Sequence, residues 1–197
     1  MKTLTYVSTK NINTLVWPAA VDNTGLYSPA TTVFTDFKKA GPRVIEANTR
    51  AEELVLLMRK EHVRMKLVVD SDNHFLGVIS LEDLSEEAFI TKVADGFTRS
   101  ELTVADLMRT KDILLALSYT SLLHADIESL LYSQRQNPLQ HLLVIDEESK
   151  AIRGLISSND VARQLRLDVD IAFSSFAMIY DNAILGVKMP HGKRQVA

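Results

Sequence analysis

The chain has 197 residues, of which 46% are hydrophobic and 24% charged, and its formal net charge is −3 from 22 basic and 25 acidic side chains. These values are typical of a globular protein, and they exclude a disordered or fibrous chain and disfavour binding to nucleic acid, which needs a basic excess. The absence of cysteine excludes disulfide bonds, thiolate catalysis and zinc–thiolate sites.

Residues 1–30 are polar, contain Pro18 and Pro29, and show no sustained periodicity. This composition predicts an arm laid over a core formed elsewhere, with Trp17, Leu26 and Tyr27 as its anchors. The segment Met1–Asn11 lacks the basic-then-apolar order of a signal peptide, and no apolar stretch is long enough to span a bilayer. We therefore expect a cytoplasmic protein without a membrane anchor.

The next part of the chain alternates between strand and helix patterns. Arg43–Ala47 is predicted to form a short strand, followed by a helix that begins near Ala51. Leu67–Asp70 and Phe75–Ser80 are typical of two strands paired as a hairpin, because both are apolar and a polar turn separates them. A second helix is predicted to begin near Leu81.

The same order then recurs, which indicates an internal repeat. Ile113–Leu117 is predicted as the strand, Ala125–Arg135 as the helix, and Leu143–Asp146 with Ile152–Ser157 as the hairpin, followed by a helix through Leu165. Beyond it, we expect a strand at Val169–Phe173 and a helix at Ser175–Leu185, which is a candidate interface. The predicted organisation is an arm (1–30), a first repeat (31–100), a second repeat (101–167) and a C-terminal extension (168–197).

The most distinctive repeated feature is a short motif that follows each hairpin. Gly77–Asp83 and Gly154–Asp160 share the order glycine, two apolar residues, serine, two variable residues and aspartate. One explanation is a capping box, in which the serine side chain caps the start of a helix and the aspartate side chain accepts a hydrogen bond from the backbone of the serine. The other is a ligand site, because a helix start offers backbone N–H groups to a phosphate while an aspartate there can hold sugar hydroxyls. Phosphate and ribose together indicate a nucleotide.

The two motifs, with the strand that ends in aspartate before each, resemble the CBS (cystathionine-beta-synthase-type) domain pair over about residues 30–167. Thr103–Met108 is similar to the usual lead-in of the second repeat. The resemblance implies an α/β fold of two tandem β-α-β-β-α repeats, packed with pseudo-twofold symmetry. It also implies clefts for adenosine ligands between the repeats and association of two chains into a disc-like homodimer.

The resemblance also implies roles for individual residues. Ser80 and Ser157 match the position that contacts phosphate, and Asp83 and Asp160 match the position that holds ribose. The residues expected to border the adenine are Val44, Ile45, Ile113 and Leu114.

The two copies differ in charge after the aspartate. Arg163 shares a helix face with Asp160 and either reaches a phosphate or is an ordinary solvated arginine. Glu86 occupies the matching place in the first copy, where Arg64 and Lys66 either compensate or point to solvent. We therefore expect the second site to bind the nucleotide more tightly.

Other kinds of site find little support in the sequence. The five histidines show no pair at the i, i+4 spacing of a metal site, and the runs of acidic residues are typical of solvated surfaces. Walker, nucleophile-elbow and dinucleotide motifs are absent, so no catalytic residues, metal or catalytic cofactor are expected.

Two hypotheses for the function remain open. The first is a regulatory sensor that binds AMP, ADP, ATP or a related adenosyl ligand and signals to an unknown partner through the packing of its repeats. The alternative is a structural interaction module whose clefts stay empty, and Glu86 is the feature that keeps it open.

Overall fold

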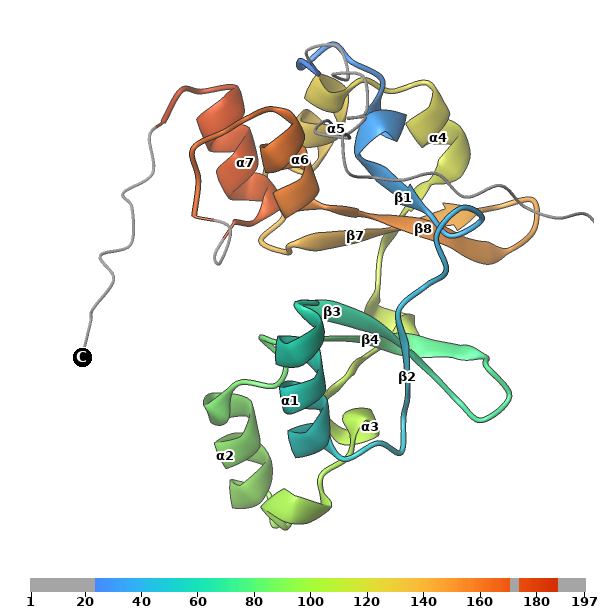
Figure 1. Ribbon diagram of the computed structural model, residues 1–197, viewed down its shortest axis with the longest axis vertical. Helices are drawn as coiled ribbons and strands as arrows, with labels where there is room; N and C mark the ends of the chain where they lie inside the picture. The colour runs from blue at the N-terminus through green and yellow to red at the C-terminus, as the bar shows by residue number, and fades with distance from the viewer. Residues whose placement is uncertain (1–23, 171–173, 188–197) are drawn as a thin grey trace, which may run out of the picture.

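The computed structural model describes residues 24–170 and 174–187 of the chain. Here the protein forms two stacked lobes, each with a four-stranded sheet and helices on its outer side, so that the two sheets face each other (Figure 1). Most of the predicted arm and part of the predicted strand at Val169–Phe173 lie outside the described residues, and Val169 and Asp170 are not in a strand. None of the helices in the described part combines the length and apolar character needed to cross a bilayer.

The first lobe is built around one hairpin. Its elements are β2 (Val44–Glu46), α1 (Ala51–Glu61), β3 (Met65–Val69), β4 (Phe75–Ser80), α2 (Glu86–Ala94), the 3-10 helix η2 (Arg99–Glu101), α3 (Val104–Leu107) and β5 (Arg109–Thr110). The sheet order is β2-β3-β4-β5. Leu54 and Met58, one helical turn apart on α1, are fully buried against Val68 and Ile79 of the sheet.

The second lobe repeats this plan and adds a helix. Its elements are η1 (Ala30–Val33), β1 (Phe34–Asp36), β6 (Ala116–Ser118), α4 (Tyr119–Leu123), α5 (Ile127–Ser133), β7 (His141–Asp146), β8 (Ala151–Ser157), α6 (Ser158–Gln164) and α7 (Phe176–Ala183), with η3 (Lys111–Ile113) leading into it. The sheet order is β1-β8-β7-β6. The predicted α/β fold with two strand–helix–strand–strand–helix repeats is therefore confirmed.

Each lobe receives one edge strand from the segment that precedes the other lobe. β1 lies within the predicted first repeat (31–100) but pairs with β8 of the second lobe, while β5 lies within the predicted second repeat (101–167) but pairs with β4 of the first lobe. This exchange could not be predicted from the sequence, because β1 and β5 have only three and two residues. The exchange joins the two lobes through backbone hydrogen bonds.

The glycines of the two motifs make room for these exchanged strands. Gly77 is opposite Thr110 of β5, and Gly154 is opposite Asp36 of β1. A Cβ atom at Gly77 would collide with the carbonyl oxygen of Arg109, and a Cβ atom at Gly154 would collide with that of Thr35. The glycines are therefore required by close approach of backbone to backbone, as expected for glycine inside a strand.

The exchanged strand β1 is also held by an ion pair. Arg153 of β8 donates from Nε and Nη2 to the two carboxylate oxygens of Asp36, at 2.8 and 2.9 Å. Both side chains are largely buried, at 14% and 12% exposure. Hydrogen bonding to this guanidinium lowers the pKa of Asp36 from its ordinary 3.8 to about 2.

The inner faces of the two sheets form a shared apolar layer. Met65, Leu67 and Val78 of the first lobe pack in one cluster with Leu143 of the second. This layer is separate from the cluster of each lobe, which lies between the sheet and its own helices. The two repeats thus contact each other sheet to sheet.

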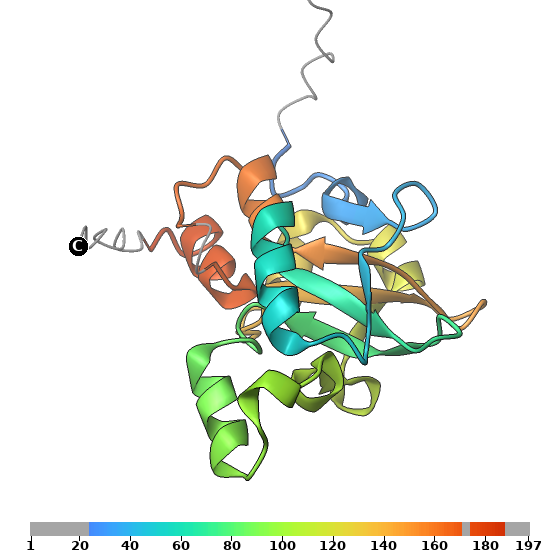
Figure 2. The same ribbon diagram turned by 60° about the horizontal axis from the view of Figure 1, so that its bottom comes forward.

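The C-terminal helix α7 belongs to the core of the second lobe. It lies beside α5 and α6 (Figures 1 and 2), and Phe176 and Ile179 on its inner face are fully buried. The apolar face of this helix is therefore already used within the chain, and its prediction as an interface is wrong for that face. Tyr27, predicted as an anchor of the arm, is 80% exposed and is not one, whereas Leu26 packs against the second core.

Two predicted elements begin later than the sequence indicated. The helix expected near Leu81 is α2, which begins at Glu86, because residues 81–84 form turns and Ser85 provides the cap by accepting a hydrogen bond from the Ala88 N–H. The strand expected at Ile113–Leu117 is β6, which begins at Ala116, because η3 occupies residues 111–113. Both shifts alter the surroundings of the predicted site residues.

Candidate functional site

The serine and aspartate of the first motif bind each other. The backbone N–H and the hydroxyl of Ser80 both donate to Oδ2 of Asp83, at 2.8 and 2.7 Å. Ser80 is buried and the side chain of Asp83 is 17% exposed. This is the reciprocal bonding of a capping box, although the segment it closes is a turn and not the first turn of a helix.

Asp83 also faces a cation that the sequence analysis did not single out. The Nε atom of Arg109, in the exchanged strand β5, lies 3.3 Å from Oδ1 of Asp83. This Nε is buried, and among the described residues it has no partner with hydrogen-bond geometry. A buried N–H without an acceptor is costly, so this donor is incompletely satisfied by the nearby carboxylate of Asp83.

Arg109 lies at the edge of a cavity between the two lobes. The cavity has a volume of about 680 Å³, within the roughly 300–1,000 Å³ typical of small-molecule sites. Its walls come from both sheets and from the segment that leads into β6, and they include Met65, Val78, Ile113, Leu114, Leu142 and Leu143. Ser133, Gln134 and Asn137 add polar groups at its border.

This cavity groups the predicted residues in a way the sequence did not show. Ile113 and Leu114, expected to border an adenine, line it together with Arg109, the partner of Asp83. Neither Ser157 nor Asp160 of their own repeat is among its lining residues. Ser80 and Asp83 do not line it either, and Asp83 is connected to it only through Arg109.

A second basic group lies next to Arg109. Arg64, just before β3, donates from Nε to the Gln140 side chain at 2.9 Å, across the boundary between the lobes. Together with Arg109, Ser80 and His141 these two residues surround a small recess beside the larger cavity. Burial, together with the charges of Arg64 and Arg109, lowers the pKa of His141 to about 4, so this imidazole is neutral at pH 7.

The second motif has a different environment. Asp160 accepts a hydrogen bond from Nη2 of Arg163 at 2.8 Å, within the same helix, and Arg163 is 69% exposed. The start of α6 is covered by the segment before α7, because the hydroxyl of Ser158 donates to the carbonyl of Ser174 and the Ser174 hydroxyl bonds the Asn159 side chain. Ser157 is buried and makes no capping bond.

Glu86 does not occupy the place that its match with Arg163 predicted. It lies in the first turn of α2 and accepts two hydrogen bonds from Arg99, at 2.8 and 2.9 Å. The bonds to Arg99 lower the pKa of Glu86, and Arg99 also donates to Glu52 on α1. The carboxylate of Glu86 thus lies in a groove between α1 and α2. Lys66, which was suggested as a compensating charge, forms an ion pair with Glu61 at 2.7 Å.

The other residues expected to border adenine are Val44 and Ile45, and their side chains lie in different parts of the first lobe. Ile45 packs against the first core, between the sheet and α1. Val44 lines another cavity, of about 730 Å³, together with residues of both hairpin turns. The structure therefore does not bring these two side chains to the cavity of Arg109.

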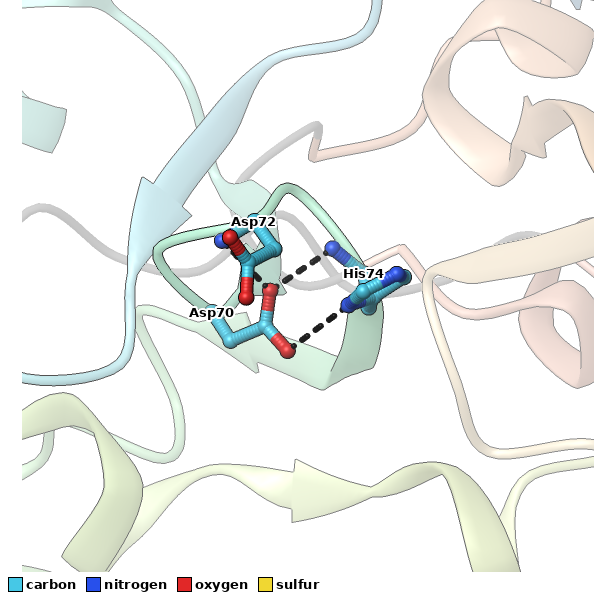
Figure 3. A group of neighbouring side chains, drawn as sticks. All are labelled: Asp70, Asp72 and His74. Carbon is cyan, nitrogen blue, oxygen red and sulfur yellow. Dashed lines mark hydrogen bonds and ion pairs between the residues drawn. The ribbon is translucent and has the colours of Figure 1, made fainter.

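One group of potential metal ligands occurs in the described residues, at the turn between β3 and β4. Asp70, Asp72 and His74 each place a ligand atom within 4.8 Å of the others (Figure 3). Asp70 accepts hydrogen bonds from the backbone N–H groups of Asp72 and His74 and from the His74 ring, and these bonds stabilise the turn. These bonds lower the pKa of Asp70 and account for the cluster as a turn structure.

The fold and the cavity define a class of protein, a stacked pair of repeats with a small-molecule cavity between them. Residues 36–89 match the family model described as CBS domain. This segment of the chain is therefore similar to a CBS domain, and the second lobe repeats the fold of the first. No curated protein matches its sequence.

Solved structures share this fold at low sequence identity. A conserved, uncharacterized protein from Pyrococcus horikoshii is 16% identical with a TM-score of 0.53, over 74% of this chain and 97% of that one. CBSX2, crystallised in complex with AMP, is 20% identical with a TM-score of 0.50, over 70% and 94%. GMP reductase from Trypanosoma brucei is 20% identical with a TM-score of 0.50, over 72% of this chain and 28% of the enzyme.

Proposed function

We propose that this protein is a regulatory module, without catalytic activity of its own, that binds an adenine nucleotide such as AMP, ADP or ATP in the cavity beside Arg109. The observation that supports this most strongly is the combination of apolar walls with the guanidinium of Arg109 at one edge, whose Nε has no hydrogen-bond partner among the described residues. A nucleotide has the matching chemistry, because its base is flat and largely apolar while its phosphate is anionic. The complex of CBSX2 with AMP shows that a protein of this fold can hold such a ligand.

In this proposal each part of the nucleotide has a partner. The base lies against Leu114 and the inner face of the first sheet, and a phosphate accepts hydrogen bonds from Arg109. The ribose hydroxyls donate to Asp83, which gives up its bond from the Ser80 hydroxyl to receive them. Because the ligand touches both lobes, it favours the packing in which both contacts form, and this differential affinity is the regulatory mechanism.

The Ser157–Asp160 motif is the candidate for a second site. From the sequence, this site is expected to bind more tightly, because Glu86 is expected to weaken the first site. The pairing of Glu86 with Arg99, and the presence of Arg109 beside Asp83, support the opposite ranking. We therefore propose that the Asp83 site binds first and that the Ser157–Asp160–Arg163 site is weaker.

We also propose that two chains associate through the helices of the first lobe. Leu56 of α1 and Ile90 of α2 are 69% and 64% exposed, whereas α7 covers the matching helices of the second lobe. Exposed apolar side chains on adjacent helices are typical of an interface. Light scattering should give twice the chain mass for the protein, and the double variant Leu56→Asp/Ile90→Asp should give the monomer mass.

The binding proposal is tested by titration calorimetry of the purified protein with AMP, ADP and ATP. Arg109→Gln should weaken the binding of the preferred nucleotide at least tenfold, because the neutral amide loses the charge-assisted hydrogen bonds to phosphate. Arg163→Gln is the matched control, since it removes the same charge from an exposed position, and should change the affinity less than threefold. Equal affinities for both variants and wild type would contradict the proposed site.

The alternative function, an interaction module with empty clefts, is favoured by a separate observation. The carboxylate of Asp83 already accepts from Ser80 and lies 3.3 Å from Arg109, so it has partners without a ligand. If AMP, ADP and ATP, each added in large excess over the protein, leave the unfolding temperature unchanged, the protein is better explained as an interaction module. A true ligand at about 100 times its Kd stabilises the fold by roughly 2.7 kcal/mol.

A further inference from the structure

A second cavity lies at the opposite end of the two sheets from the serine motifs. In each hairpin one end carries the motif serine, where Ser80 pairs with Met65 and Ser157 pairs with His141. The other end carries the turn, and the cavity of about 730 Å³ lies there, lined by residues of both turns. It is therefore distinct from the cavity beside Arg109, and its place does not depend on the proposed nucleotide site.

The walls of this hairpin-end cavity are apolar. Val69 and Phe75 of the first hairpin line it together with Ile145 and Ile152 of the second, and Phe37 lines it from the segment that connects the lobes. Phe37, Phe75 and Ile152 are only partly buried in the layer between the sheets. Apolar walls of this extent favour a ligand with a hydrocarbon or aromatic body.

Two lysines stand at the border of the cavity. Lys111 follows β5, and Lys150 lies in the turn between β7 and β8. Among the described residues, neither ammonium group forms an ion pair or a hydrogen bond, and both residues are exposed. Their charges are thus available to a ligand.

Among the described residues, neither Asp70 nor Asp146, which lie at the end of the first strand of each hairpin, forms an ion pair with these lysines. Asp70 is held by backbone N–H groups and by His74, which itself lines the cavity. Asp146 accepts from the backbone of Glu148 and Ser149 and lies 3.7 Å from Arg153. The residues that line the cavity therefore include two lysines and no carboxylate.

The backbone at Lys150 provides a second, independent observation. Lys150 has a φ of 52°, in the left-handed region that glycine and asparagine adopt more readily than lysine. The matching position of the first hairpin, two residues before Phe75, is Asn73, with a φ of 64°. The second turn thus keeps a lysine where the backbone favours asparagine, and its side chain borders the cavity.

We propose that the hairpin-end cavity binds a small amphipathic anion, with an apolar body between the two sheets and a single carboxylate held by Lys111 and Lys150. The apolar walls determine the body of the ligand, and the two lysines determine its charge. Decanoate, a ten-carbon monocarboxylate, is the simplest probe with both features.

The proposal is tested by calorimetric titration of the full chain with decanoate, with decanol as the uncharged comparison. Decanoate should bind with a stoichiometry of one per chain and at least tenfold more tightly than decanol. Lys111→Gln/Lys150→Gln should lower the affinity for decanoate at least tenfold, while Lys60→Gln/Lys92→Gln, which removes the same charge from the helices of the first lobe, should leave it within threefold. No binding of decanoate, or equal effects of the two double variants, would overturn the proposal.

Two further variants separate this site from the fold and from the nucleotide site. Ala151→Trp, at an exposed position that lines the cavity, should abolish decanoate binding and leave the affinity for the preferred nucleotide unchanged. Lys150→Asn should raise the unfolding temperature, because asparagine suits the left-handed backbone, and yet weaken decanoate binding. Retained decanoate binding in Ala151→Trp would show that the ligand occupies another place.

Discussion

The two repeats carry the same motif but surround it differently. In the first repeat the motif aspartate lies 3.3 Å from Arg109 of the exchanged strand, which lines the cavity between the lobes. In the second repeat Asp160 pairs with Arg163 of its own helix, and the residues before it are tied to Ser174 and covered by the segment leading to α7. A repeated sequence motif therefore predicts a repeated local fold but not a repeated site, because the site depends on neighbouring segments that are not repeated.

The largest expected effect concerns the helix that covers only the second repeat. Phe176→Ala should lower the free energy of unfolding by about 4 kcal/mol, because this fully buried side chain fills the core of that lobe. Leu185→Ala, at a site 59% exposed just after α7, is the control and should cost under 1 kcal/mol. Urea titration measures both. A small effect of Phe176→Ala would mean that α7 is an added surface helix and that the two repeats differ less than the structure shows.

The next effect tests what the two lobes share. Gly77→Ala and Gly154→Ala should each destabilise the protein by about 3 kcal/mol, because the added Cβ collides with the backbone of an exchanged strand. Gly41→Ala, where nothing lies within 4 Å of the new atom, should change stability by no more than about 1 kcal/mol. The same chemical denaturation provides the measurement. If only one of the two motif glycines proves sensitive, the strand exchange is not symmetric.

A smaller effect is expected on the stability of the protein at acid pH. The Arg153 hydrogen bonds hold the folded pKa of Asp36 at about 2, below its ordinary 3.8, so the stability this pair provides is complete above about pH 4 and is lost as pH falls towards 2. Asp36→Asn should therefore flatten the fall in stability between pH 4 and pH 2. Arg153→Lys, which keeps the charge but loses the two-armed geometry, should give an intermediate slope. An unchanged slope in Asp36→Asn would assign the acid sensitivity to other carboxylates.

Much of the fold could be predicted from the sequence because its strongest patterns are local. The hairpin strands are apolar runs that flank polar turns, and β4 spans Phe75–Ser80 as expected. The exchanged strands could not be predicted, because two or three residues carry no periodicity and their pairing is decided by tertiary contacts. The start of α2 was misplaced because Ser80 and Asp83 have the spacing of a helix cap, while the true cap, Ser85, follows five residues later.

The candidate site was only partly predictable for the same reason. Ser80 and Asp83 stand out by repetition, and Ile113 and Leu114 by their place before a strand. Arg109, which links them, lies in a strand of two residues that no pattern indicates, although it directly follows the Thr103–Met108 lead-in. The grouping of residues from different repeats depends on how the sheets stack, which spacing along the chain does not encode.

The most direct test of the difference between the repeats is a calorimetric titration of the preferred adenine nucleotide into two matched variants, Asp83→Asn and Asp160→Asn. Loss of a carboxylate that receives ribose hydroxyls should weaken the tighter site at least tenfold. The account predicts that Asp83→Asn removes the tighter binding event and that Asp160→Asn retains it. Retention in Asp83→Asn together with loss in Asp160→Asn would contradict the assignment of the site to the boundary beside Arg109.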